Sequence, residues 1–347
     1  MTSPDGITWT SRTSAAANEW TSVTYGNGLW VAVSQDGTVG NQVMTSSDGI
    51  TWTSRTAAAN NSWQSVTYGN GLFVAVSLDG VGNRVMTSPD GITWTSRTSA
   101  ANKTWFSVTY GNGLFVAVSY YDGLMTSPDG ITWTSRTAAA DNWRTVTFGD
   151  GLFVAVGYGA NGHVMTSPDG INWTSRTPAV DNAWYSVAYG NGLFVATSPD
   201  GSGNRVMTSP DGITWTSRTS AADESWYAVG YGDGLFVAVS STGNINNRIM
   251  TSGLIGLAAR NSAAEAARVA AAAEAARVAA EAEAAKKAKE QKELLEILGV
   301  LPSIAGISVN IGDLANTLLV KQKCVKGKTV KYVKKGSSCP KGYVKKK

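Results

Sequence analysis

The twelve residues MTSPDGITWTSR, Met1–Arg12, decide the fold, because the chain repeats them with few changes. Further copies begin at Met44, Met86, Met125, Met165 and Met207, and a seventh copy, which begins at Met250, ends after MTSG. Successive copies start 39 to 43 residues apart. A fixed period of this length is typical of repeat proteins, in which each repeat is one structural unit that packs on its neighbours.

The second repeat predicts four antiparallel strands. Trp63–Gly69 alternates and is rich in β-formers, and Leu72–Ser77 is apolar on both faces. Asn70-Gly71 lies between them and predicts a two-residue hairpin, since a type I′ turn needs positive φ at both positions. Arg84–Ser88 and Ile92–Thr98 are the third and fourth predicted strands.

The segment between the third and fourth strands predicts a tight turn. In Ser88-Pro89-Asp90-Gly91, proline presets φ at the second position of a type I turn and glycine takes the fourth. The aspartate is expected to accept hydrogen bonds from the backbone of its own turn, which is a structural role. The six equivalent residues are Asp5, Asp48, Asp90, Asp129, Asp169 and Asp211.

Four antiparallel strands per period of about 40 residues, with both faces apolar, are typical of a β-propeller blade. First strands and fourth strands each occur six times within residues 1–252. We therefore predict an all-β, six-bladed propeller. The last blade stops after its third strand, so the N-terminal strand Ile7–Thr13 is expected to complete it and close the ring. Met1–Ser3 would then be unpaired or would displace Met250–Ser252.

The segment SPDGITW resembles the Asp-box of BNR-type propellers, which occur in sialidases, sortilin-like receptors and many non-catalytic proteins. The usual pattern, Ser/Thr-x-Asp-x-Gly-x-x-Trp, lies between the third and fourth strands of a blade. This chain has one residue fewer between Asp and Gly. The resemblance covers residues 1–252 and implies a propeller fold.

The differences between repeats are concentrated on one predicted face. The NG and SPDG turns share one side of a propeller, whereas the loops that differ between copies share the other side. A near-identical scaffold with one variable face is expected of a recognition surface. The residue after each first-strand Trp also varies, and these residues are the candidate ligand contacts: Thr21, Gln64, Phe106, Arg144, Tyr185 and Tyr227.

The composition argues against catalysis. Residues 1–252 contain two glutamates, Glu19 and Glu224, and the chain has one histidine, His163. A sialidase requires an arginine cluster, a Tyr–Glu pair and an acid that each come from a unique position, and six symmetric aspartates do not meet that requirement. No Ser-His-Asp set and no His/Cys/carboxylate set for a metal is recognisable. We therefore expect a non-enzyme without cofactor or metal.

The composition changes after residue 252. We predict a linker at 253–261, an Ala-rich helical stalk at 262–299, an apolar segment at 300–322 that allows oligomerisation through 294–320, and a basic tail at 323–347. Eleven lysines and no acidic residue lie beyond Val320. Cys324 and Cys339 are expected to form a disulfide, which implies an oxidising compartment. The tail resembles the C-terminal tails of predicted bacterial surface proteins.

Together these features predict a non-enzymatic recognition or adhesion protein, extracellular or displayed at the cell surface. The variable face would bind a glycan or a protein, and the tail an anionic cell-envelope polymer or lipid, with nucleic acid the least favoured partner. The alternatives are a phage or particle fibre and a sialidase-like glycoside hydrolase. No signal peptide precedes Met1, and the expectation is that this start is an internal repeat methionine.

Overall fold

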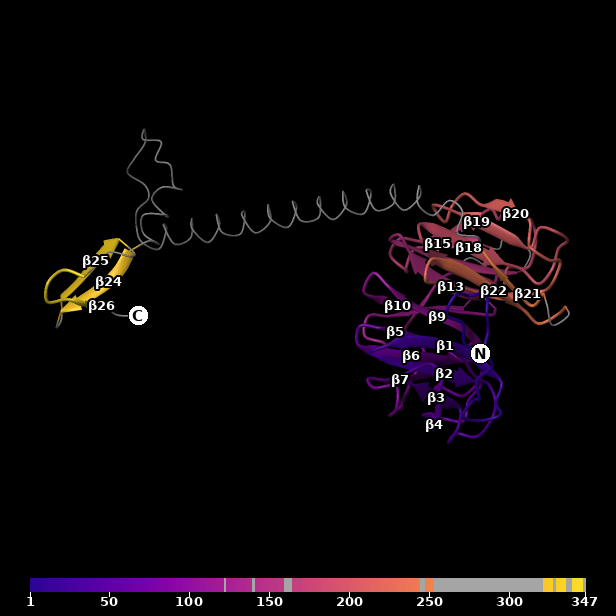
Figure 1. Cartoon of the computed structure of the whole chain (residues 1–347), viewed down its shortest axis with the longest axis horizontal. Helices are drawn as coiled ribbons and strands as arrows, with labels where there is room; N and C mark the ends of the chain where they lie inside the picture. The colour runs from indigo at the N-terminus through magenta and orange to yellow at the C-terminus, as the bar shows by residue number, and fades with distance from the viewer. Residues whose placement is uncertain are drawn as a thin grey trace. The chain divides into compact units, whose positions relative to one another are not determined.

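The computed structural model describes residues 1–121, 123–138, 141–158, 164–243, 247–252, 321–326, 329–334 and 339–345. The chain forms two compact units, Met1–Arg268 and Val269–Lys347. The first unit contains six antiparallel sheets arranged as propeller blades (Figure 1), and five of them have four strands while the sixth has three. The predicted six-bladed all-β propeller is confirmed.

The strands follow the repeats closely. The first blade contains β1 (Trp20–Gly26), β2 (Leu29–Ser34), β3 (Val43–Ser46) and β4 (Thr53–Arg55). The second contains β5 (Trp63–Gly69), β6 (Leu72–Ser77), β7 (Val85–Ser88) and β8 (Thr95–Arg97), and the third β9 (Trp105–Gly111), β10 (Leu114–Ser119), β11 (Gly123–Ser127) and β12 (Thr134–Arg136). The fourth contains β13 (Asn142–Gly149), β14 (Leu152–Tyr158), β15 (Val164–Ser167) and β16 (Thr174–Arg176), and the fifth β17 (Ser186–Gly190), β18 (Leu193–Thr197), β19 (Val206–Ser209) and β20 (Thr216–Arg218). The sixth contains β21 (Trp226–Gly232), β22 (Leu235–Ser240) and β23 (Ile249–Thr251).

Turn chemistry sets the strand ends within a blade. Asn70 and Gly71 have φ values of 49° and 75°, as the hairpin between β5 and β6 requires. The fourth strand, β8, is shorter than predicted, because the Asp90 carboxylate accepts the N–H groups of Ile92 and Thr93, both at 2.8 Å. Those two residues therefore belong to the turn and not to the sheet.

Neighbouring blades are joined by one contact that recurs around the ring. The ring of Tyr110 lies against Gly69 of the preceding blade, so closely that a Cβ on this glycine would be 2.1 Å from the ring. The Ser65 hydroxyl accepts the Val108 N–H at 3.2 Å. Val74 and Val76 share a buried cluster with Phe115 and other side chains of the next blade. Apolar burial between blades therefore contributes to the stability of the propeller.

The ring closes differently from the prediction. Thr10 pairs with Thr2 through two backbone hydrogen bonds of 2.9 and 2.8 Å, so residues 1–13 form a hairpin of their own, here the N-terminal hairpin. Arg12 Nε donates to Thr2 Oγ1 at 2.9 Å, as the equivalent arginine does in the complete blades.

The prediction that Ile7–Thr13 becomes the fourth strand of the last blade is therefore wrong. Among the described residues β23 has a partner on one side only, namely β22, and Met1–Ser3 neither displaces it nor lies unpaired. The physical reason is proximity along the chain. Thr2 and Thr10 close a loop of a few residues, whereas pairing Thr10 with β23 would close a loop of about 240 residues, at a higher entropic cost.

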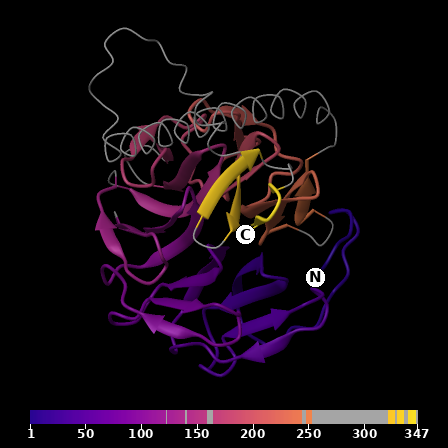
Figure 2. The same ribbon diagram turned by 90° about the vertical axis from the view of Figure 1, so that its left-hand side faces the viewer.

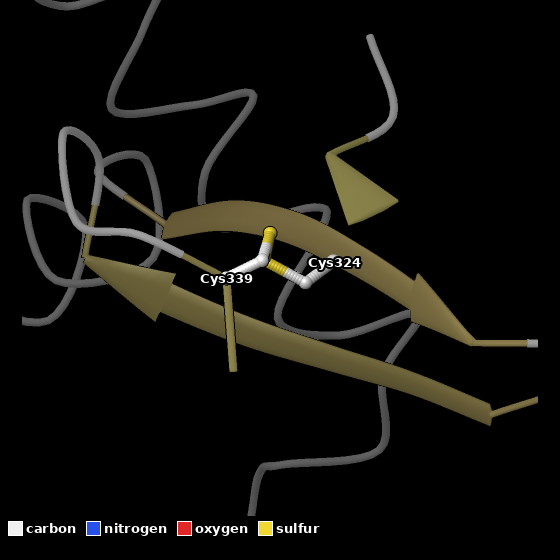
Figure 3. The surroundings of a disulfide bond; sticks show 2 residues. All are labelled: Cys324 and Cys339. Atoms are coloured by element: carbon white, nitrogen blue, oxygen red, sulfur yellow. A yellow bond between two sulfur atoms is a disulfide. The ribbon is translucent and has the colours of Figure 1, made fainter. Parts of the chain in front are cut away.

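The second unit contains a small sheet in the order β25-β24-β26, made of β24 (Lys321–Lys326), β25 (Thr329–Lys334) and β26 (Val344–Lys345). A disulfide joins Cys324 in β24 to Cys339, and their Cα atoms are 5.7 Å apart (Figure 3). The Cys324 side chain is fully buried. The predicted disulfide is therefore present.

Several predictions lie outside the described residues. These are the linker 253–261, the stalk 262–299, most of the apolar segment 300–322, whose last two residues belong to β24, and the oligomerising role of 294–320. The part of the chain that is described includes no helix long and apolar enough to cross a membrane.

Candidate binding site

The candidate site is an aromatic cluster on the side of the propeller that carries the variable loops. It consists of six rings in mutual contact and one cation, Arg144, which contacts two of them. The rings belong to Phe106, Tyr120, Tyr121, Tyr158, Tyr185 and Tyr227. Four successive blades, the third to the sixth, contribute to it.

Arg144 lies between two rings. Its Cζ atom is 4.2 Å from the centroid of Phe106 and 4.3 Å from the centroid of Tyr185, so the preceding and following blades both contact the guanidinium. Strand geometry explains this arrangement. Each of these residues follows the first-strand Trp of its blade, and those tryptophans, Trp105, Trp143 and Trp184, are fully buried in equivalent positions.

The tyrosines form a continuous row. Tyr120 contacts Phe106 at 6.0 Å, Tyr121 at 4.2 Å and Tyr158 at 5.6 Å between centroids. Tyr158 stacks on Tyr185 at 5.4 Å with an angle of 14° between the rings, and Tyr185 meets Tyr227 edge-on at 5.3 Å. Tyr121 and Tyr227 are exposed to solvent. The row therefore offers aromatic surface beside a cation.

The cation of the cluster has no anionic partner within the part of the chain that the structure describes. No ion pair or hydrogen bond to Arg144 occurs among the described residues. Burial lowers the pKa of its guanidinium, and the nearby tyrosines, Tyr185 first, oppose that shift. Arginine still stays charged in proteins. Burial also raises the pKa of Tyr158, and its hydrogen bond with Tyr120 adds to the rise. The site is thus a half-buried positive charge among neutral rings.

This geometry favours a carboxylate ligand. A guanidinium that is stacked on both faces keeps its N–H donors at its rim, in the plane that suits bidentate binding of a carboxylate. Aromatic faces beside it suit the apolar face of a sugar or a planar side chain. Cation–π contacts with Phe106 and Tyr185 hold the guanidinium in place before any ligand arrives.

The six sequence candidates divide into two groups. Phe106, Arg144, Tyr185 and Tyr227 come together in the cluster. Thr21 does not, since its hydroxyl donates to the carbonyl of Trp63 at 2.8 Å and so bridges two blades. Gln64 is half-buried, and no ring of the cluster contacts it among the described residues.

Sequence reasoning missed three members of the cluster, Tyr120, Tyr121 and Tyr158. They lie at the ends of β10 and β14, where the loops read YYDG and GYGANGH. The usable signal was local. At these positions the first and second repeats carry QDG and LDG, and aromatic residues appear only in the third and fourth blades, whose inner strands carry Phe106 and Arg144.

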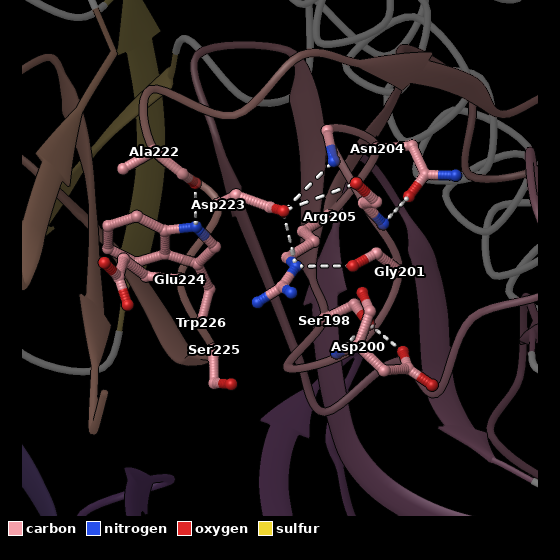
Figure 4. Close-up of polar contacts among 12 residues, drawn as sticks. Ser198, Asp200, Gly201, Asn204, Arg205, Ala222, Asp223, Glu224, Ser225 and Trp226 are labelled. Carbon is pink, nitrogen blue, oxygen red and sulfur yellow. Dashed lines mark hydrogen bonds and ion pairs between the residues drawn. The ribbon is translucent and has the colours of Figure 1, made fainter. Parts of the chain in front are cut away.

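Polar contacts between adjacent loops support this face. In Figure 4, Arg205 Nε lies 3.0 Å from an oxygen of Asp223 and donates to the Gly201 carbonyl at 2.9 Å. Asp223 also accepts the Gly203 N–H at 3.1 Å, so the loop of the fifth blade is joined to the loop that enters the sixth. These contacts connect the loops of the fifth and sixth blades on this face.

The six turn aspartates accept hydrogen bonds from the backbone of their own turns. Each accepts two backbone N–H groups, as Asp48 does from Thr51 and Ile50 at 2.8 Å. These hydrogen bonds, from Thr51 first, lower the pKa of Asp48 to about 2. The Asp5 pKa is lowered to about 2 in the same way, with Thr8 as the first donor. The arginine at the end of each TSR segment also has a partner within its own repeat. Its Nε donates to the threonine of the preceding MTS segment at 2.9 Å in all six copies.

Both glutamates of the propeller also contact neighbouring loops. Glu224 accepts hydrogen bonds from Asn247 Nδ2 at 2.8 Å and from the Thr242 hydroxyl at 3.1 Å, and Glu19 accepts one from Gln35. Within the described ranges no group of three or more His, Cys, Asp or Glu side chains is placed to hold a metal ion.

Comparisons with known proteins agree on the fold. No protein-family model and no curated protein matches this chain. Among solved structures, virginiamycin B lyase from Staphylococcus aureus aligns with a TM-score of 0.57 and 10% identity over 68% of this chain and 84% of that one. The β-propeller domain of Myceliophteria thermophila Cps50 (Swd1) aligns with a TM-score of 0.50 and 10% identity over 67% and 82% of the two chains. YCF48 bound to D1 peptide aligns with a TM-score of 0.40 and 19% identity over 52% and 60%. At these identities the first two alignments show a propeller fold and assign no activity.

Proposed function

We propose that this chain is a non-enzymatic recognition protein that binds a carboxylate-bearing glycan through the aromatic cluster around Arg144. A propeller is in general a scaffold for interactions, and its function has to be argued from the site. The observation that carries the proposal is Arg144 itself. It is half-buried between Phe106 and Tyr185, at 4.2 and 4.3 Å from their centroids, and no described carboxylate pairs with it.

The ligand class follows from the chemistry of the cluster. A partly desolvated cation that has no counter-ion among the described residues is stabilised by an anionic ligand, and a charge-assisted hydrogen bond contributes about 1.5–3 kcal/mol. The exposed rings of Tyr121 and Tyr227 add stacking surface. Uronic and sialic acids combine a carboxylate with an apolar ring face, so acidic glycans fit better than neutral ones. A protein ligand would have to present a carboxylate beside an apolar group.

The non-enzymatic part of the proposal is supported by the roles of the turn aspartates and of the two glutamates. The turn aspartates accept hydrogen bonds from their own turns, and Glu19 and Glu224 accept them from loop residues. A glycoside hydrolase needs two carboxylates on opposite sides of one scissile bond. Neither the cluster nor its tyrosine row contains one.

The second unit fits attachment to the cell envelope, in line with extracellular or surface display. Its hairpin carries lysines on β24 and β25, and the disulfide between Cys324 and Cys339 connects β24 to the segment that precedes β26. Lys331 Nζ lies 5.5 Å from the centroid of Tyr343. Closely spaced lysines favour a polyanion such as a cell-wall polymer or an anionic lipid.

The test is binding of the full chain to an array of neutral and acidic glycans, with released sugar measured in the same wells. We expect saturable binding to carboxylated glycans and no release. Arg144→Ala should weaken that binding about 10- to 150-fold, the range that corresponds to one charge-assisted hydrogen bond. Arg144→Lys should also weaken it, since lysine lacks the planar fork.

Arg97→Ala is the matched control, because it removes the same charge from an outer strand, where Arg97 Nε donates to Thr87. Its affinity should equal that of the unmodified chain. Binding that is equal for neutral and acidic glycans, or unchanged in Arg144→Ala, would refute the proposal. Sugar release would favour a hydrolase, and assembly without any glycan binding would favour a particle fibre.

A further inference from the structure

Between the sixth and the first blade, the described residues include no inner strands. Five interfaces between successive blades are alike. In each of them a ring of the next blade covers a glycine at the end of the preceding inner strand, and the pairs are Gly26 with Tyr68, Gly69 with Tyr110, Gly111 with Phe148, Gly149 with Tyr189, and Gly190 with Tyr231. The inner strands β21 and β1 have no comparable contact within the described residues. The position between the sixth and the first blade is therefore different.

The N-terminal hairpin occupies the outer half of this position. A Cβ on Gly6 would lie 3.4 Å from Leu235 and 3.4 Å from Val237 of the sixth blade. In the third blade, the equivalent Gly130 faces Leu72 and Val74 of the second blade in the same way, both at 2.9 Å. The hairpin thus packs on the sixth blade as the third and fourth strands of a following blade would.

The other side of the hairpin is equally regular. The Ser54 hydroxyl of the first blade donates to the Ala15 carbonyl at 3.2 Å, and Ser135 of the third blade donates to the equivalent Ala100 carbonyl at 3.3 Å. In Figure 2 the N-terminal segment, coloured indigo, lies between the orange strands of the last blade and the first blade. Residues 1–13 are therefore the outer half of a further blade.

The apolar side chains that face the inner half of this position are exposed to solvent. On the first blade, Val23 is 55% exposed whereas its equivalent Val108 is 5% exposed. Trp30 is 37% exposed, and its equivalent Phe115 is fully buried. On the sixth blade, Val239 is 39% exposed although its equivalent Val118 is fully buried, and a Cβ on Gly232 would meet no atom within 4 Å.

We infer that this position is a binding site for a β-hairpin that carries a further copy of the first two strands of the repeat. The pattern is Trp-x-Ser-Val-x-Tyr-Gly-Asn-Gly-Leu-Phe-Val-Ala-Val-Ser, as in β5 and β6. The argument is continuity with the five interfaces already formed, because both walls of the site present the surfaces that these interfaces bury.

The complementary contacts can be assigned one by one. In the bound hairpin, the tyrosine of the pattern covers Gly232 of the sixth blade. The glycine that follows this tyrosine is covered by the ring of Tyr25 in the first blade, which is 54% exposed without the hairpin. Its serine accepts the Val23 N–H, as Ser22 accepts the Val66 N–H at 3.1 Å. One hydrogen bond of the other interfaces cannot form here. The sixth blade has Ala228 at the position where the other blades carry the serine or threonine that faces the next blade.

The test uses the full chain and a peptide of residues 63–77, which contains β5 and β6, with two lysines added at each end for solubility. Titration calorimetry should give one peptide bound per chain, and bound peptide should raise the thermal midpoint of the propeller. Gly232→Val should abolish both effects without changing the free chain, because its side chain would lie where the tyrosine ring has to pack. Gly40→Val is the matched control, since a Cβ on Gly40 also meets no atom within 4 Å.

A second arm keeps the inference testable if the isolated peptide does not form a hairpin. Residues 63–85 are fused directly ahead of Met1, since Met86 and Met1 begin equivalent copies. The fusion should raise the thermal midpoint by about 5 °C or more, and Gly232→Val should remove most of that gain. Failure of both peptide and fusion overturns the inference. Binding that Gly232→Val leaves intact, or a dimer in which a second chain covers Val23 and Gly232, overturns it as well.

Discussion

The open position predicts that equivalent valines in the first and third blades contribute unequally to stability. Val108 is 5% exposed and packs against the preceding blade, whereas Val23 occupies the same place in its repeat and is 55% exposed. Replacing valine by alanine removes about two methylene equivalents, each worth about 0.8 kcal/mol when buried. With the cavity that remains, Val108→Ala should destabilise the propeller by about 2 kcal/mol. Val23→Ala should destabilise it by less than about 1 kcal/mol, since half of the side chain already contacts water.

The assay is urea unfolding of the full chain, followed by tryptophan fluorescence, with the two variants and the unmodified chain measured side by side. Val66→Ala and Val146→Ala serve as replicates of the buried case, because these residues are 5% and 4% exposed. Equal losses for Val23→Ala and Val108→Ala would refute the reasoning, because Val23 would then have to be covered in solution. A larger loss for Val23→Ala would contradict the packing itself.

Three further predictions follow from local contacts. Gly111→Ala should destabilise the propeller by about 1–3 kcal/mol or more, since the new Cβ would lie 2.1 Å from the Phe148 ring. Gly232→Ala should change the free energy of unfolding in urea by less than about 0.5 kcal/mol. In the folded chain the carboxyls of Asp5 and Asp48 have pKa values of about 2, against a usual 3.8. The stability that they contribute is therefore complete above pH about 4 and is lost as the pH falls toward 2. The thermal midpoint should fall with pH across this range, and Asp48→Asn should reduce the dependence of the midpoint on pH. Cys324→Ser opens a bridge that spans 15 residues and should destabilise the small sheet by about 3 kcal/mol, seen as faster hydrogen exchange in β24 and β25 at an unchanged thermal midpoint of the propeller.

The fold could be predicted from the sequence because every blade repeats the same local signals. The Asn70-Gly71 hairpin and the SPDG turn each depend on residues within the turn itself, and the structure has the strands β5 and β6 with the predicted bounds. Ring closure could not be predicted in the same way. The choice between pairing Thr10 with Thr2 and pairing it with β23 depends on loop entropy and on packing against Leu235, and neither appears in a strand count.

Only part of the candidate site could be predicted from the sequence, for a related reason. Counting from the first-strand Trp placed Phe106, Arg144, Tyr185 and Tyr227 on one face, since equivalent positions of equivalent strands must share a face. The contribution of Tyr120 and Tyr158 depends on how two loops turn toward the neighbouring blade. The stacking of Arg144 between two rings is a relation between blades, which no single repeat encodes.

The near-identity of the strands also has a consequence for the route to the folded state. Val74 in β6 pairs with Thr87, 13 residues away, but Thr126, 52 residues away, is the equivalent partner in the next blade. Each doubling of loop length disfavours closure by about 0.6 kcal/mol, so distance alone favours the correct partner only about eightfold. A chain that refolds from urea meets all of these partners at once, so mispaired strands should slow its refolding until they separate. On the ribosome, a blade is completed before its competitor emerges, so the order of synthesis supplies information that the strand sequences lack.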